Sequence, residues 1–156
     1  MLEGTPKSFF LTCGSAEGFT PLNAFDAALI AAGIGDLNLV KVTSIIPPGC
    51  REGAAVTFPK GSIVPAAFAY ITSDIPGEVI SAAVAVALPR DPEDPGLIME
   101  YSARGHREEA EQIVRRMAEE GMKIRGKEIS TLKSCSVEYK VEKIGAAVAA
   151  VVFRMD

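Results

Sequence analysis

Apolar and polar residues alternate along most of this chain, in short runs separated by turn residues. Such alternation is typical of β-strands, because successive side chains of a strand point to opposite faces. The last run has no polar position, which predicts a strand that is covered on both sides or lies at an interface. The first predicted strand, at residues 8–13, is expected to end in a turn at residues 14–18. Strands are predicted at residues 8–13, 37–44, 62–74, 78–89, 96–101, 134–142 and 146–153.

A first helix is predicted at residues 20–33. Thr20 is a residue type that caps helix N-termini, Pro21 suits the first helical position, and Gly33 is the expected stop. Asp26 stands beside the apolar stripe of this helix. Its carboxylate should therefore face packed or interfacial surface, where it needs a cation or a hydrogen-bond donor. The stripe consists of Leu22, Phe25, Leu29 and Ala32.

A second helix is predicted at 107–120, ending at Gly121, with Glu111 and Arg115 as an i,i+4 pair. The elements follow the order strand, helix, several strands, helix, two strands. This order predicts an α+β fold in which sheets pack between or against two helices. A chain of 156 residues fits a single domain, 1–156. The core stripe of the predicted helix at 107–120 is Ala110, Ile113, Val114, Met117 and Ala118.

Composition narrows the possible partners. Hydrophobic residues make up 48% of the chain, more than one small core hides, so we expect subunit interfaces. The net charge is −4 and the basic residues are scattered, which argues against nucleic acid or an anionic membrane as a partner. Three widely spaced cysteines and one histidine make a disulfide framework or a zinc site improbable. No signal peptide or membrane-spanning run is evident, and a reducing cytoplasm is the simplest location.

Familiar catalytic motifs are absent. Gly33-Ile34-Gly35 follows a predicted helix, whereas a dinucleotide-binding fingerprint follows a strand. No phosphate-binding loop and no G-x-S-x-G nucleophile motif occur. His106 lies among charged residues and is interpreted as a solvated helix start. A Ser-His-Asp hydrolase is therefore not indicated.

A few polar residues occupy positions that are unusual for purely structural roles. Asp26 lies on a helix stripe, Glu100 lies in an apolar strand, and the Thr43-Ser44 bond precedes a double proline. Alternation along 37–44 places Asn38 on the same strand face as Ser44. Each residue also has an ordinary structural interpretation. Asp26 could cap or pair locally, and Asn38 could bond a neighbouring backbone group. Ser44 could be a strand-end hydroxyl, and Glu100 could point to solvent from an edge strand.

Together these residues lie in segments that resemble the archaeal-type pyruvoyl-dependent arginine decarboxylases. The matching stretches are GSAEGFTPLNAFDAALIAAGIGDLNLVKVTSIIPPG, PKGSIVPAAFAYITSDIPGEVISAAVAVALP and GLIMEYSARG, with EEAE and VEYKVEKIGAAVAA beyond them. The resemblance covers nearly the whole chain. It implies a layered α/β/β/α sandwich with helices outside two sheets, and a trimer of cleaved protomers with active sites between neighbouring subunits.

The resemblance also implies self-cleavage between Thr43 and Ser44, giving a β chain of 1–43 and an α chain of 44–156. Ser44 would become a covalent pyruvoyl group, and Asn38 would assist this step. Many relatives have Ser-Ser where this chain has Thr-Ser; the upstream residue supplies only its carbonyl, so cleavage should tolerate the change. Backbone strain at the strand-to-proline junction is a further hypothesis.

For catalysis, the resemblance implies that Glu100 donates a proton and that Asp26 binds the guanidinium of arginine. The implied product is agmatine, a precursor of polyamines. Apolar neighbours of Glu100 would favour its neutral form, and a planar guanidinium suits a carboxylate. Two alternatives stay open. The same cofactor could act on another amino acid, or the chain could be an uncleaved, inactive homologue that serves as a binding module.

Overall fold

The computed structural model describes residues 4–156, which form two helices and nine strands. The helices are α1 (Pro21–Ala31) and α2 (Arg107–Ile124). Neither combines the length and apolar character that crossing a membrane requires. The strands are β1 (Ser8–Glu17), β2 (Asn38–Lys41), β3 (Ile45–Ile46), β4 (Arg51–Glu52), β5 (Ile63–Ser73), β6 (Val79–Pro89), β7 (Gly96–Arg104), β8 (Ile129–Lys140) and β9 (Gly145–Arg154).

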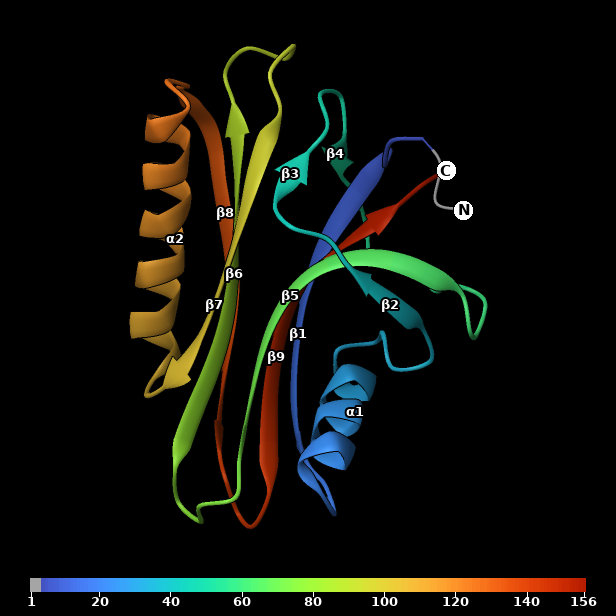
Figure 1. The fold of residues 1–156 in the computed structure, drawn as a ribbon, viewed down its shortest axis with the longest axis vertical. Helices are drawn as coiled ribbons and strands as arrows, with labels where there is room; N and C mark the ends of the chain where they lie inside the picture. The colour runs from blue at the N-terminus through green and yellow to red at the C-terminus, as the bar shows by residue number, and fades with distance from the viewer. Residues whose placement is uncertain (1–3) are drawn as a thin grey trace.

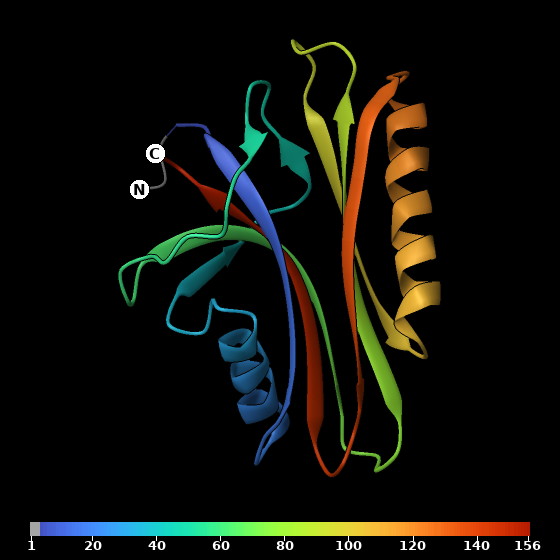
Figure 2. The ribbon, with the colours of Figure 1, turned by 180° about the vertical axis from the view of Figure 1, so that it is seen from behind.

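The elements form four layers, with one helix on each outer side of two stacked sheets (Figure 1). The five-stranded sheet has the order β2-β5-β9-β1-β4, and the four-stranded sheet has the order β3-β7-β6-β8. Helix α1 packs on the first sheet and α2 on the second, as the view from behind also shows (Figure 2). The expected α/β/β/α sandwich is confirmed.

Strand β9 lies in the middle of the five-stranded sheet and is buried along almost its whole length. One row of its side chains packs between the two sheets, and the other packs under α1. This double burial explains why the strand has no polar face, as the sequence predicted. The inner row is Ala147, Ala149, Val151 and Phe153, and the outer row is Ala146, Val148, Ala150 and Val152.

Helix α1 begins as predicted, because the Thr20 hydroxyl accepts a hydrogen bond from the backbone of the first turn at 3.2 Å. The predicted apolar stripe is right for Phe25, Leu29 and Ala32, which pack against the core, and wrong for Leu22. Leu22 is 74% exposed, whereas Ala24 and Ala28 are fully buried. The reason is the close approach of α1 to β1, where a side chain at Gly14 would overlap the Ala28 carbonyl. Only small residues fit this contact.

Helix α2 extends to Ile124, so the predicted end at Gly121 is wrong. Gly121 is buried inside the helix, and a methyl group there would overlap the Leu97 side chain of β7. The glycine therefore permits close packing of α2 on its sheet rather than ending the helix. Ile113, expected in the core stripe, is 42% exposed.

Strand β1 is longer than predicted, because residues 14–17 continue its pairing with β9 instead of turning. Glu17 lies opposite Gly145 at the end of this ladder. Its carboxylate accepts hydrogen bonds from the backbone N–H groups of Lys143 at 2.8 Å and Ile144 at 3.0 Å. The turn between β8 and β9 is thus attached to the end of β1.

The chain crosses from one sheet to the other immediately after β2. The N–H of Val42 still donates to the Ala66 carbonyl of β5 at 3.0 Å, in the five-stranded sheet. The Ser44 carbonyl accepts from the N–H of Ile98 in β7 at 2.7 Å, in the four-stranded sheet. The Thr43–Ser44 bond therefore lies at the crossing, and the strand predicted to reach residue 44 ends at Lys41.

Candidate active site

The Thr43–Ser44 bond lies between two surface depressions, and both residues line each of them. The larger depression has a volume of about 580 Å³ and the smaller one about 300 Å³. The larger is lined by Lys41, Val42, Thr43, Ser44, Ile98, Met99, Glu100 and Met117. The smaller is mostly apolar and is lined by Gly4, Pro6, Val42, Thr43, Ser44, Ile45, Pro65, Phe153 and Met155. The bond is thus reachable from two sides.

Glu100 enters the larger depression from β7. It lies two residues beyond Ile98, whose N–H donates to the Ser44 carbonyl. Across the sheet it pairs with Val84, whose side chain belongs to the core between the two sheets. Glu100 Oε1 is 3.3 Å from Lys41 Nζ. Its Oε2 is buried and has no hydrogen-bond partner among residues 4–156. Strand pairing therefore places a half-buried acid beside the Thr43–Ser44 bond.

The environment of Glu100 favours its protonated form. Burial raises the pKa of the Glu100 carboxyl above its ordinary value, although the ammonium group of Lys41 opposes the shift. Because Lys41 is 54% exposed, its charge is partly screened by water. The direction agrees with the expectation from the apolar neighbours of Glu100, while its role in proton donation stays a prediction.

Lys41 was not among the residues that the sequence indicated. Its Nζ lies 5.0 Å from the centroid of the Phe68 ring, in addition to its contact with Glu100. Its sequence signal is a single cation in a short strand, next to two apolar residues. Such a signal is weak, because exposed lysines are common on edge strands.

Asn38 is not brought to Ser44 within the described chain. Its side-chain Nδ2 donates to the Gly61 carbonyl at 2.9 Å, which ties β2 to the preceding turn of β5. It lines neither depression around Ser44. The shared strand face was predicted from an alternation that ends at Lys41, and the crossing then turns the chain. The role of Asn38 in processing stays a prediction.

Asp26 faces solvent on the outer side of α1. It shares this face with Leu22, 74% exposed, and Ile30, 60% exposed, while the opposite face packs on the sheet. No hydrogen bond or ion pair holds its carboxylate within residues 4–156. A single chain therefore does not place Asp26 beside Ser44, and the packed or interfacial surface expected for Asp26 is not formed within one chain.

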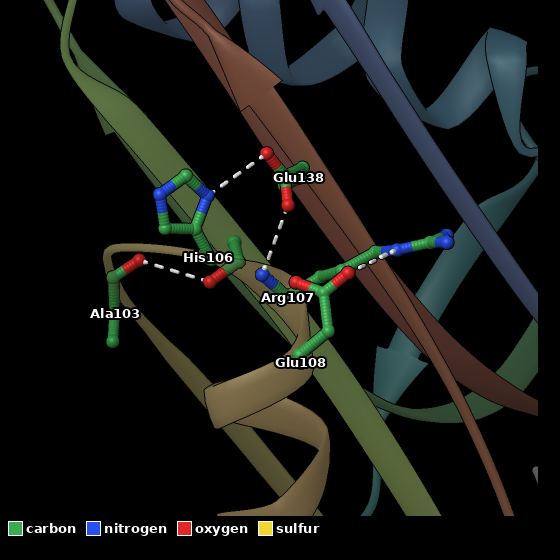
Figure 3. A network of polar contacts seen from close by, with 6 residues as sticks. Ala103, His106, Arg107, Glu108 and Glu138 are labelled. Carbon is green, nitrogen blue, oxygen red and sulfur yellow. Dashed lines mark hydrogen bonds and ion pairs between the residues drawn. The ribbon is translucent and has the colours of Figure 1, made fainter.

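A separate polar cluster surrounds the start of α2 (Figure 3). His106, Glu108 and Glu138 offer possible ligand atoms within 4.8 Å of one another, all at exposed or half-buried positions. Glu138 accepts a hydrogen bond from the Arg107 backbone at 3.2 Å, and its other oxygen lies 3.2 Å from His106 Nδ1. These contacts stabilise the first turn of the helix, and His106 is the solvated helix start that the sequence predicted.

The comparisons with known proteins agree with this geometry. The model of the family described as pyruvoyl-dependent arginine decarboxylase (PvlArgDC) matches residues 8–156. The chain belongs to this family. It is 50% identical over 145 residues to the pyruvoyl-dependent arginine decarboxylase of Methanocaldococcus jannaschii. This match covers 93% of this chain and 88% of the relative. It is 46% identical over 151 residues to the enzyme of the same name from Pyrococcus abyssi, and this match covers 95% of both chains.

The fold is also similar to a solved structure of a pyruvoyl-dependent histidine decarboxylase. The TM-score is 0.53 at 17% sequence identity, and the match covers 63% of this chain. The chain spans about half of that structure, 52% of its length. At this identity the similarity supports the layered fold alone.

Members of the pyruvoyl-dependent arginine decarboxylase family use a covalently bound pyruvoyl group. The residues around the Thr43–Ser44 bond fit such a group. Ser44 supplies a hydroxyl in a depression large enough for a small substrate, and Glu100 presents there a buried carboxyl oxygen that no group of residues 4–156 hydrogen-bonds. The chemistry of this site is therefore compatible with the family's cofactor.

Proposed function

We propose that this chain converts L-arginine into agmatine and carbon dioxide with a pyruvoyl group derived from Ser44. The observation that carries the proposal is the position of the Thr43–Ser44 bond. It lies at the crossing between the sheets, in the same depression as the half-buried acid Glu100. Family membership supplies the reaction class.

The pyruvoyl group would arise from the chain's own residues. Ser44 Oγ attacks the Thr43 carbonyl carbon, so that the acyl group moves from nitrogen to oxygen, and elimination of the resulting ester breaks the chain. Residue 44 is left as dehydroalanine, which water converts into the pyruvoyl group and ammonia. The reaction draws on no left-handed backbone strain, because among residues 4–156 only glycines have positive φ. We retain Asn38 as a candidate helper, although its amide must turn away from Gly61.

Cleavage at this bond is compatible with the fold. Strand β1 of the smaller fragment pairs with β9 along its whole length and also with β4, and both partners belong to the larger fragment. Strand β2 pairs with β5 in the same way. The two fragments therefore share one sheet and one core, so backbone hydrogen bonds and burial hold them together after the bond is broken.

Glu100 is the proposed proton donor. When present, the pyruvoyl group takes up the electrons released as carbon dioxide leaves the substrate. Burial in the same depression raises the pKa of Glu100, which favours the neutral acid that a proton donor requires. The ammonium of Lys41, 3.3 Å from Oε1, limits this shift and lies where it can attract the substrate carboxylate.

Asp26 is proposed to bind the guanidinium of arginine across a subunit interface. A carboxylate binds guanidinium through two parallel, charge-assisted hydrogen bonds. Because Asp26 lies on the outer face of α1, it would act at the Ser44 site of a neighbouring subunit. The exposed apolar side chains around it, Phe19, Leu22 and Ile30, support an interface there. We propose a trimer of cleaved protomers, which light scattering of the native protein would test.

The deciding experiment measures mass and product on the same sample. After denaturation and reduction, wild-type protein should give two fragments ending at Thr43 and beginning at residue 44. It should release agmatine from arginine, while Ser44→Ala stays whole and inactive. A panel with lysine, ornithine and histidine tests the substrate. Cleavage with turnover of another amino acid only would overturn the assignment to arginine, and an intact, inactive wild-type chain would overturn the proposal.

A further inference from the structure

Two of the three cysteines meet between the two sheets. Cys13 lies on β1 of the five-stranded sheet, and Cys135 lies on β8 of the four-stranded sheet. Both side chains pack against the core between the sheets, and their sulfur atoms are 2.6 Å apart. They are 122 positions apart in the sequence. Wide spacing was one of the reasons why the sequence made a disulfide framework improbable; the fold brings these two cysteines together as free thiols.

We propose that Cys13 and Cys135 form a disulfide under oxidising conditions and thereby join the two sheets covalently. A disulfide requires a sulfur–sulfur distance of about 2.05 Å, so the two thiols have only about 0.5 Å to close. Each cysteine is fixed by a long ladder, because Cys13 pairs with Ala149 and Cys135 pairs with Val84. The fold therefore presents the pair in position before any bond forms.

The third cysteine provides a contrast within the same molecule. Cys50 is only 6% exposed, and no other cysteine sulfur contacts it among residues 4–156. Burial raises the pKa of its thiol, which disfavours the reactive thiolate. Cys13 and Cys135 are half-buried, so a small oxidant reaches them more readily. Oxidation should therefore select this pair and leave Cys50 as a thiol.

The electron balance requires an oxidant, for which a small disulfide such as oxidised glutathione suffices. The thiolate of one cysteine attacks a sulfur of that disulfide, whose S–S bond breaks and releases one thiol. The second cysteine then attacks the mixed disulfide, releases the other thiol and closes the internal bond. The protein loses two electrons and two protons, and the oxidant gains them. Cys13 is suited to the first attack, since the hydrogen bond from Cys135 lowers the pKa of Cys13.

The bond has a further consequence that rests on the proposed self-cleavage. Cys13 belongs to the fragment 1–43 and Cys135 to the fragment 44–156. Oxidation would therefore reconnect covalently the two fragments that cleavage separates. Reduced protein would rely on strand pairing and burial alone. The pair thus makes the cohesion of the mature protomer dependent on redox conditions.

Thiol counting tests the disulfide directly. Folded wild-type protein is incubated with oxidised glutathione, denatured without reductant, and treated with a maleimide. We expect one labelled thiol per chain, Cys50, and a peptide that links Cys13 to Cys135. Cys50→Ser should leave no labelled thiol and keep the link, whereas Cys13→Ser and Cys135→Ser should each lose it. Three labelled thiols in the oxidised wild type, or a link that includes Cys50, would overturn the proposal.

The same samples separate this proposal from self-cleavage. Mass spectrometry after reduction reports whether the Thr43–Ser44 bond is broken, independently of the thiol count. If the chain is cleaved and linked, the unreduced sample runs as one species that reduction splits in two. If reduction yields one intact chain, self-cleavage fails, while the labelled thiols still decide the disulfide.

Discussion

The disulfide between Cys13 and Cys135 should produce a large, measurable change in stability when the chain is kept continuous. The Ser44→Ala variant serves this purpose, because it removes the nucleophile of the proposed cleavage. The bond would close a loop across 122 positions of the chain. Loop-closure entropy then predicts that oxidation raises the free energy of unfolding by about 5 kcal/mol. For a domain of this size, such a gain raises Tm by roughly 10–20 °C.

The assay compares oxidised and reduced Ser44→Ala in guanidinium chloride at one protein concentration, since subunit association also contributes to stability. The chain has no tryptophan, so far-ultraviolet circular dichroism is the suitable signal for unfolding. Cys135→Ser in the same background is the matched control. It removes one sulfur of the pair and should show no gain when oxidant is added.

The result that would refute this reasoning is a linked protein without added stability. If peptide mapping finds the bond but the free energy of unfolding stays at the reduced value, the disulfide must strain the folded sheets by as much as it constrains the unfolded chain. The 2.6 Å distance between the sulfurs would then not reflect a geometry ready for bonding.

Further predictions concern the active site and its support. Glu100→Gln should lower turnover by about 10²–10⁴-fold in a steady-state assay, and wild-type turnover would remove Glu100 from the mechanism. Because the folded state holds the Glu100 proton more tightly than the unfolded chain, wild-type stability should fall as pH rises from the ordinary glutamate pKa to the raised one. Denaturation of Glu100→Gln across that window should lack this fall. Asp26→Asn should impair arginine turnover far more than self-cleavage, and normal arginine kinetics would contradict its assignment. Thr43→Ala should still yield two fragments by mass, since only the carbonyl of that residue reacts. Gly121→Ala should lower the free energy of unfolding by about 1–3 kcal/mol, because its methyl would overlap Leu97; an unchanged value would show that the contact yields.

Patterns local in the sequence predicted the secondary structure well where one physical effect dominated. The uninterrupted apolar run at 146–153 became β9, covered on both faces. The cap at Thr20 marked the start of α1 correctly. Predictions failed where packing against a distant element decided the outcome. Gly121 looked like a helix end, but its small size serves the contact with Leu97.

The candidate site shows the same division. Ser44 and Glu100 stood out because a hydroxyl before a double proline and an acid in an apolar strand are locally unusual. Their proximity depends on the hydrogen bond from Ile98 to the Ser44 carbonyl, which joins segments about fifty residues apart. Lys41 and Cys135 carried no comparable local signal, because their importance comes from the partners that the fold supplies.

By itself, the sequence determined the family, the two helices, most strands and the residues suited to the chemistry, because these depend on residue type and short-range spacing. The tertiary structure alone decided which of these residues meet. It placed the Thr43–Ser44 bond at the crossing between the sheets, buried Glu100 Oε2 beside it, and left Asp26 on an outer face. It also brought the Cys13 and Cys135 sulfurs into contact. Such meetings arise from the stacking of two sheets, which no local pattern encodes.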